Sequence, residues 1–332
     1  MDENSALTQT THETHGKRFF YLTDYMTAIL CVFFAIVRFA TVGLDNARFG
    51  NLSIDRGLAW GVLFLIGAAL IWVMAKLLNP VRNSLATWFR LFYVQLYYLI
   101  FFQNCIMLSN IIYRGRSLDG LLASWEESIF GFQPALEFYP IFQNNPFVTE
   151  VLFFSYFSFY LLFTIGIWLL FIRGKRKAAR VTHNIVTAGF YLLYIVYVFL
   201  PVQGPKYYFS SLNELWYQNF QGFIFTTFLT DAFGQITLAG AAFPSSHAAI
   251  AVLVVLMSLK YQRAVGIIFI LLATLILTSA VYIYAHYVID ILAGIVLGFV
   301  YYKVLPKFVE ALKNLFIDLD SRIGPILKIK AL

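Results

Sequence analysis

Charged residues are scarce in this chain. Asp, Glu, Lys and Arg together make up 12% of its 332 residues, about half of the fraction that soluble domains usually carry. Hydrophobic residues reach 60% and aromatic residues 19%. A composition so poor in charge excludes an ordinary water-soluble domain and predicts an integral membrane protein.

Cysteine is almost absent as well. Cys31 and Cys105 are the two cysteines of the chain, and both lie inside apolar runs. This excludes a disulfide framework and a cysteine-rich metal site. The polar residues 1–17 contain no short apolar core with a small-residue cleavage site. The sequence therefore predicts no removable signal peptide, and it predicts that the first apolar run is a permanent membrane span.

The sequence contains several long apolar runs. One crossing of a bilayer needs about 20 apolar residues, and such runs lie at 25–43, 58–78, 86–112, 150–172, 183–201, 245–261 and 264–303. The last run is about twice the length of one crossing, so it must turn inside. Thr278, Ser279 and the segment 282–287 interrupt it with polar groups. We therefore predict an all-α, polytopic helical bundle with about eight transmembrane helices.

The net charge of +7 would suggest a nucleic-acid partner in a soluble protein. In a membrane protein, Lys and Arg gather on the cytoplasmic side instead. With eight spans and a cytoplasmic amino terminus, 18 of the 24 Lys and Arg residues fall on that side. We predict that both termini are cytoplasmic, that the bilayer is the main partner, and that no nucleic acid is bound.

Two segments outside the spans have a pattern of their own. In 117–130, apolar residues recur at helical spacing, and they are Leu118, Leu121, Leu122, Trp125 and Ile129. This predicts a short helix that lies in the outer membrane interface. The loop 202–243 is long, and long structured loops over a bundle often cover a functional site.

Three motifs fall at the same predicted membrane surface, the outer one. They are Gly-Pro-Lys at 204–206, Phe-Pro-Ser-Ser-His at 243–247 and His-Tyr-Val-Ile-Asp at 286–290. Each motif alone has a structural explanation: a snorkelling lysine, a helix cap and a structural hydrogen bond between His and Asp. Their meeting on one face favours a functional site.

The second and third motifs suggest phosphoryl chemistry. Pro244 begins a helix whose unpaired N–H groups attract an anion, and Ser245 and Ser246 add hydroxyl donors. His286 and Asp290 are four residues apart on one helix face. The carboxylate fixes the tautomer of the imidazole, which makes His286 a candidate nucleophile toward phosphorus.

The remaining polar residues complete this hypothesis. His247 is placed to protonate the leaving oxygen and then to activate the acceptor. Lys206, with the two serines, is placed to stabilise charge on the phosphoryl oxygens. Arg38 lies inside the first span, where it either pairs within the bundle or snorkels. His183 falls on the opposite face, and we interpret it as non-catalytic.

Two other classes compete with this hypothesis. His247, His286 and Asp290 are also three potential zinc ligands, but further carboxylates for a two-metal site are missing, and we predict neither a metal nor a cofactor. A transporter would use broken helices and paired charges at mid-membrane. Here the polar residues gather at one interface and no internal repeat is visible, which favours an enzyme.

The motif at 243–247, followed about 40 residues later by His-Tyr-Val-Ile-Asp-Ile-Leu-Ala-Gly at 286–294, resembles the type 2 phosphatidic acid phosphatase/haloperoxidase superfamily. The resemblance implies a six-helix core in which His286 is the nucleophile, Asp290 orients it and His247 is the acid and base. It implies that Ser245 binds phosphate and that no metal or cofactor is needed. The substrate it implies is a membrane lipid phosphate or phospholipid.

The sequence departs from this family at two places. The family's first motif ends in Arg-Pro, but Asn213 stands seven positions after Lys206, and Ala280 follows Ser279 where the third motif has arginine. The branch that resembles inositol phosphorylceramide synthases and sphingomyelin synthases also lacks the strict arginine pattern. That branch passes a phospho-headgroup to an alcohol rather than to water. We assign Lys206 as the replacement phosphate ligand, and Tyr282 is a candidate auxiliary residue because it lies close before His286 in the sequence. The missing arginines leave a catalytically inactive relative as an alternative.

Together these interpretations divide the chain into four parts. We predict a cytoplasmic tail at 1–24, two accessory transmembrane helices at 25–85, a phosphatase-like catalytic membrane domain at 86–303 and a basic cytoplasmic tail at 304–332. The active site is predicted on the periplasmic, extracellular or lumenal face. The acceptor, water or an alcohol, is left open.

Overall fold

The computed structural model describes residues 21–49, 52–77, 84–209, 220–234 and 239–326. Most of the predicted tail at 1–24, the last six residues of the chain and Asn213 lie outside the described residues. The elements are α2 (Leu22–Phe39), β1 (Asn46–Phe49), β2 (Leu52–Asp55), α3 (Arg56–Leu77), α4 (Ser84–Phe92), α5 (Val94–Tyr113), α6 (Asp119–Phe130), α7 (Pro134–Phe142), α8 (Pro146–Ile172), α9 (Arg176–Phe199), α10 (Pro205–Tyr208), α12 (Ile224–Gly234), α13 (Ser246–Tyr261), α14 (Arg263–Tyr282) and α15 (Val288–Ile326).

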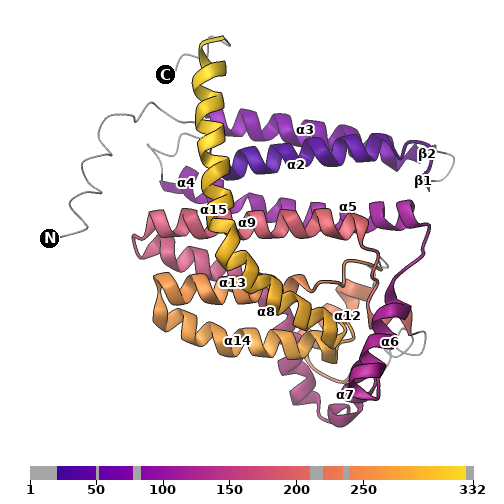
Figure 1. Cartoon of the computed structure of the whole chain (residues 1–332). Coiled ribbons are helices and arrows are strands. Elements are labelled where there is room, and N and C mark those ends of the chain that lie inside the picture. Colours follow the sequence, from indigo (N-terminus) through magenta and orange to yellow (C-terminus); the bar gives the residue numbers. More distant parts are fainter. Residues whose placement is uncertain (1–20, 50–51, 78–83, 210–219, 235–238, 327–332) are drawn as a thin grey trace.

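Most of the long helices lie side by side in one bundle, and α15 runs across them (Figure 1). Among the described residues, seven helices are long and apolar enough to cross a membrane, and α13 is a shorter apolar helix of 16 residues. Each of the eight predicted spans coincides with one of these helices. The predicted all-α polytopic membrane fold is confirmed, and the described residues add to it the short helices α7, α10 and α12 and the small antiparallel hairpin β1–β2.

The turn that the sequence places least clearly lies between α14 and α15. Helix α14 ends at Tyr282 and α15 begins at Val288, inside the predicted polar break. Tyr284 takes a left-handed backbone conformation (φ 63°), and the carbonyl of Ala280 accepts hydrogen bonds from the N–H groups of Ala285 and His286. The chain thus reverses without glycine or proline, the residues that usually mark such a turn.

Helix α13 lies at the centre of the bundle and packs against α8, α9, α14 and α15. Its residues 248–251 are fully buried, and three of these four are alanine. A helix that is apolar all round belongs in a core. Helix α15 comes close to α13 through Gly294 and Gly298, which face α13 with almost no room for a side chain.

The hairpin of α2 and α3 is attached to the rest of the bundle by buried ionic groups. Arg38 donates to Asn104 Oδ1 from both Nε (2.9 Å) and Nη2 (2.7 Å), and its Nη1 lies 3.1 Å from Asp45 Oδ2. At the other end of α2, Asp24 pairs with Arg90. Charges inside a membrane protein need such partners. Of the two explanations considered for Arg38, pairing within the bundle is the one observed.

The short helices α6, α7 and α12 gather at one end of the bundle, whereas α4 lies at the other end (Figure 1). Helix α6 forms where the sequence predicts it, with Leu118, Leu121, Trp125 and Ile129 exposed, whereas Leu122 is buried. Helices α7, α10 and α12 lie at the same end as the starts of α13 and α15. Within the described residues of the predicted loop at 202–243, α10 and α12 are helical, and both contribute residues to the surroundings of the motifs.

Candidate active site

Helices α13 and α15 begin next to each other. The N–H of Ser245 donates to the backbone carbonyl of Asp290 at 3.0 Å. Ser245 is the N-cap of α13, and its hydroxyl accepts from the N–H of Ala248. On the other helix, the N–H of Tyr287 donates to Asp290 Oδ2 at 2.8 Å. These contacts fix the two histidine motifs relative to each other.

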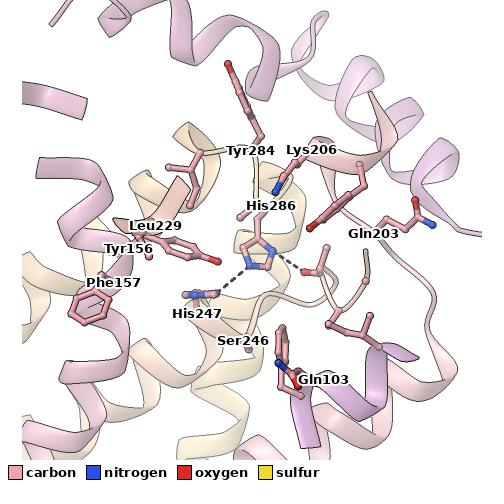
Figure 2. A pocket seen from close by; sticks show the side chains of 18 of the residues that line it. Gln103, Tyr156, Phe157, Gln203, Lys206, Leu229, Ser246, His247, Tyr284 and His286 are labelled. Atoms are coloured by element: carbon pink, nitrogen blue, oxygen red, sulfur yellow. Dashed lines mark hydrogen bonds between the residues drawn. The ribbon is translucent and has the colours of Figure 1, made fainter. Parts of the chain in front are cut away.

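The two motif histidines are in direct contact. His247 Nδ1 lies 3.2 Å from His286 Nε2, and Figure 2 shows the two rings meeting in the pocket. On its other side, His286 Nδ1 lies 2.9 Å from the carbonyl oxygen of Ala242 and 3.5 Å from Asp290 Oδ2. The carbonyl oxygen of Ala242 and the ionised carboxylate of Asp290 can only accept hydrogen bonds. The ring proton of neutral His286 is therefore on Nδ1, where it can be donated to them. The lone pair of His286 is thereby left on Nε2.

Aromatic rings enclose His247. Its ring stacks on Tyr156, with centroids 4.5 Å apart, and lies 4.3 Å from the ring of Phe159. Its Nε2 is buried and has no hydrogen-bond partner among the described residues. Nδ1 is therefore the ring nitrogen that can exchange a proton at the contact with His286.

A cavity of about 490 Å³ opens beside the histidine pair. It lies between α5, α8, α10 and the turn before α15, and its lining is mostly apolar. Besides four tyrosines, its lining includes the polar side chains of Gln103, Gln203, Lys206, Ser246 and the two histidines (Figure 2). Phe228 and Leu229 of α12 form part of its wall. An apolar cavity with a few convergent polar groups is the usual form of a small-molecule site.

A second cavity of about 360 Å³ continues from His247 between α5, α8 and α9. The two cavities adjoin each other, and both are lined by Leu99, Phe102, Tyr160, Ser246 and His247. Leu96 and Leu99 line the second cavity and are largely exposed on the outside of the bundle. This cavity therefore leads from the histidine pair toward the surface that faces lipid.

Lys206 is the cation of the first cavity. Its side chain is buried, and its backbone N–H donates to the carbonyl of Tyr284 at 2.9 Å. Its Nζ lies 4.9 Å from the centre of the Tyr207 ring. Burial lowers the pKa of Lys206 to about 8, because a low-dielectric environment disfavours the charged form. Lys206 is thus mostly protonated at neutral pH.

The structure brings together most of the predicted site residues. His247, His286, Lys206 and Ser246 line one cavity, and Asp290 lies behind His286. Ser245 is fully buried, and its hydroxyl caps α13. Ser246 is therefore the serine that the cavity can reach.

Tyr282 lies apart from this group. Its hydroxyl is 2.8 Å from Thr149 Oγ1, and its ring packs among Phe138, Tyr139 and Phe220. It is not among the residues that line either cavity. Its position four residues before His286 does not bring it to the cavity, because the end of α14 turns it toward α7 and α8.

The three residues weighed as zinc ligands do not surround one point. They form a row in which His286 stands between Asp290 and His247, and each contact uses a different nitrogen of the His286 ring. Within the described residues, no three His, Cys, Asp or Glu side chains are gathered as a metal site would need.

Sequence reasoning missed two acidic residues beside the site. Asp119 and Glu126, both on α6, are fully buried. Asp119 accepts hydrogen bonds from the segment before Lys206, and Glu126 accepts them from the start of α15. The sequence signal was the spacing of seven residues, which places both on one face of the predicted helix. Burial raises the pKa of Glu126 to about 7, although the N–H groups of Ile289 and Val288 oppose this shift.

Comparison with known proteins gives one match. No curated protein and no solved structure matches this chain. A family model described as the PAP2 superfamily matches residues 121–304, which extend from α6 into α15. The match includes both histidine motifs and more than half of the sequence. This chain belongs to the PAP2 superfamily.

Proposed function

We propose that this membrane protein cleaves a phosphoester bond of a lipid phosphate or phospholipid through a phosphohistidine on His286. Membership of the PAP2 superfamily supports an enzyme of the phosphatase or phosphotransferase kind. The observation that carries the proposal is the row Asp290–His286–His247, which ends in a cavity that also holds Lys206.

In the first step, the lone pair of His286 Nε2 attacks phosphorus and the bond from phosphorus to the leaving lipid oxygen breaks. His247, which enters this step as the imidazolium, gives its Nδ1 proton to that oxygen and becomes the neutral imidazole. Asp290 and the carbonyl of Ala242 accept the Nδ1–H of His286 and stabilise the positive charge that forms on this ring. Lys206 and Ser246 are placed to bind the phosphoryl oxygens, where charge is concentrated.

In the second step, His247 is the base. It takes a proton from the acceptor, water or an alcohol, while the acceptor oxygen attacks phosphorus and the P–N bond breaks. The phosphoryl group leaves with the acceptor and His286 is regenerated with its lone pair on Nε2. Each histidine thus returns to its initial protonation state.

The separation of the two rings sets a condition on substrate binding. An in-line arrangement of attacking nitrogen, phosphorus, leaving oxygen and acid spans roughly 6–7 Å, whereas the two nitrogens are 3.2 Å apart. The phosphoryl group must therefore enter from the cavity and part the two rings.

A specific observation favours an alcohol as acceptor, which is the second candidate function. The second cavity adjoins the first at His247 and extends from there between α5, α8 and α9, where the largely exposed Leu96 lines it. A lipid alcohol whose chain occupies this cavity would bring its hydroxyl to His247, the proposed base. The protein would then transfer the phosphoryl group, or a phospho-headgroup, between two lipids.

The test uses the purified full-length protein in detergent with a chelator. Phosphate release is measured from a panel of lipid phosphates, and transfer is measured from phosphatidylinositol to ceramide or diacylglycerol. We expect the chelator to leave product formation unchanged. Release in water supports the phosphatase, and product only with a lipid alcohol supports the transferase. No product from any donor and acceptor would contradict the proposal.

The pKa of Lys206 predicts how donor binding depends on pH. Since this pKa is about 8, the cation is present below that pH and is lost as pH rises through it. The KM for the phosphorylated donor should therefore rise above about pH 8, and kcat/KM should fall. Lys206→Arg keeps its charge at high pH, so its KM should stay flat over the same range.

Lys206→Met is the matched uncharged variant. Its KM should be high at every pH and show no change near pH 8. Measured KM values from about pH 7 to about pH 9.5 for the three proteins test this directly, because a phosphate monoester is already a dianion over that range. A wild-type KM that stays constant would show that Lys206 does not bind the donor.

A further inference from the structure

Helix α6 has two fully buried carboxylates although much of its surface is exposed. Asp119 and Glu126 are 0% exposed, and each accepts hydrogen bonds from backbone far away in the sequence. Burying a carboxylate is costly unless donors replace its water. The donors here belong to the segments that carry the site residues.

Glu126 binds the start of α15. Its Oε1 accepts from the N–H of Val288 at 2.5 Å and from the N–H of Ile289 at 3.2 Å. These are first-turn N–H groups, which have no partner inside their own helix. The negative charge of a carboxylate at this end also interacts favourably with the positive pole of the helix dipole. Because the two N–H groups lie between His286 and Asp290 in the chain, Glu126 fixes the backbone that presents both side chains.

Asp119 joins two other segments. Its Oδ2 accepts from the N–H of Gln203 at 2.8 Å, and its Oδ1 accepts from the N–H of Gly204 at 2.8 Å. Oδ1 also accepts from the Tyr287 hydroxyl at 3.2 Å. Gly204 adopts a positive φ of 93° directly before the short helix that carries Lys206. Asp119 therefore ties the segment of Lys206 to the residue that follows His286.

We propose that Glu126 and Asp119 are positioning residues that hold His286, Asp290 and Lys206 in their catalytic arrangement through the backbone. Neither carboxylate lines the cavities beside the histidine pair, so they act on the reaction through other groups. This inference rests on the proposed function, because it concerns the geometry of the same site. It gives α6 a role beyond that of a helix in the membrane interface.

Replacing each carboxylate by the corresponding amide should have a different effect at the two positions, and this difference makes the inference testable. Glu126 makes both hydrogen bonds with Oε1, while its Oε2 has no partner among the described residues. The oxygen of Glu126→Gln can therefore keep both bonds. Asp119 uses both oxygens to accept from N–H groups. Asp119→Asn would turn an amide NH₂ toward one of these donors, so it should be as harmful as Asp119→Ala.

The experiment measures kcat and KM with dioctanoyl phosphatidic acid, or with phosphatidylinositol and diacylglycerol if only transfer is seen. We expect Glu126→Ala, Asp119→Ala and Asp119→Asn to lower kcat by on the order of 10²-fold, the effect of a misplacement near 1 Å, with KM little changed. Glu126→Gln should stay within a few-fold of the wild type. Glu127→Ala is the matched control, since Glu127 is the exposed neighbour on the same helix.

Amide hydrogen exchange of the segment 285–291 gives a readout that needs no turnover. Glu126→Ala should speed exchange there, while Glu126→Gln and Glu127→Ala should not. Unchanged kcat in Glu126→Ala, or unchanged exchange, would overturn the inference. If Glu126→Ala does not fold, the contrast between Glu126→Gln and Asp119→Asn decides, and equal activity of these two would overturn it. Failure of the proposed function would appear separately, as full turnover by His286→Ala.

Discussion

Replacing His286 by alanine is expected to abolish lipid phosphate turnover, with a loss in kcat of at least about 10⁴-fold, as for other catalytic nucleophiles. The reason is the position of its Nε2, whose lone pair faces the cavity while Nδ1 is held by Ala242 and Asp290. No other side chain of the site has an unprotonated nitrogen held in this way. The measurement is turnover together with the yield of acid-labile phosphoenzyme, which should be zero.

His247→Ala is the informative partner of this variant, because the leaving group then decides the outcome. A lipid alkoxide needs a proton, so lipid turnover should fall by about 10²–10⁴-fold. p-Nitrophenyl phosphate releases a stable anion without a proton, so the first step should survive. The second step still needs the base. We therefore expect a burst of nitrophenolate and an accumulating phosphohistidine on the peptide that contains His286.

Two results would contradict this assignment. Phosphate recovered on the peptide of His247 would reverse the roles of the two histidines. Wild-type turnover by His286→Ala would remove the phosphohistidine from the mechanism. His183→Gln is the control for loss of a buried histidine, since His183 is buried in α9 and does not line either cavity. It should keep the kcat of the wild type.

The fold was predictable because a bilayer imposes a length on each helix. Apolar runs of about 20 residues can be counted, and the number of runs before each motif decides on which face it lies. That is why the motifs at 204–206, 243–247 and 286–290 were placed on one face before their contacts were known. The division at Tyr282–Tyr287 followed from the same length limit rather than from a turn signal.

The positioning role of α6 was not predictable for a physical reason. Glu126 binds backbone N–H groups that lie more than 160 positions further along the chain. Every residue except proline has an N–H group, so the sequence contains no trace of such a partner. The spacing of Asp119 and Glu126 shows that they share a helix face, but it does not show what that face contacts.

Neighbours in the sequence were also separated by the structure. In the sequence, Ser245 and Ser246 are equivalent hydroxyl donors. In the structure, Ser245 caps helix α13, whereas Ser246 lines the cavity. Helix boundaries from sequence are uncertain by one or two residues, which is enough to exchange these roles. Arg38 likewise donates a hydrogen bond to Asn104, a residue 66 positions away in the sequence.

The contact between α13 and α15 supplies the second large effect, which we expect from Gly294→Ala. An added Cβ would lie 2.5 Å from the carbonyl oxygen of Ser245 and 2.7 Å from the Cβ of Ala248. Because the first of these is a backbone atom, the two helices must move apart. Overpacking of this kind typically costs about 1–3 kcal/mol of stability. The larger consequence is for the site, since His247 and His286 approach each other only where these helices begin.

We expect Gly294→Ala to lower kcat by on the order of 10²-fold or more, because a shift near 1 Å is enough to misplace a nucleophile. Val296→Ile adds one methyl group to the exposed face of the same helix and should be neutral in kcat and in thermal unfolding. Adding Ala248→Gly to Gly294→Ala removes one of the two clashes and should restore part of the activity. Full activity of Gly294→Ala alone would mean that the start of α15 can move away from α13 without separating the two histidines, and the row Asp290–His286–His247 would then not depend on this helix contact.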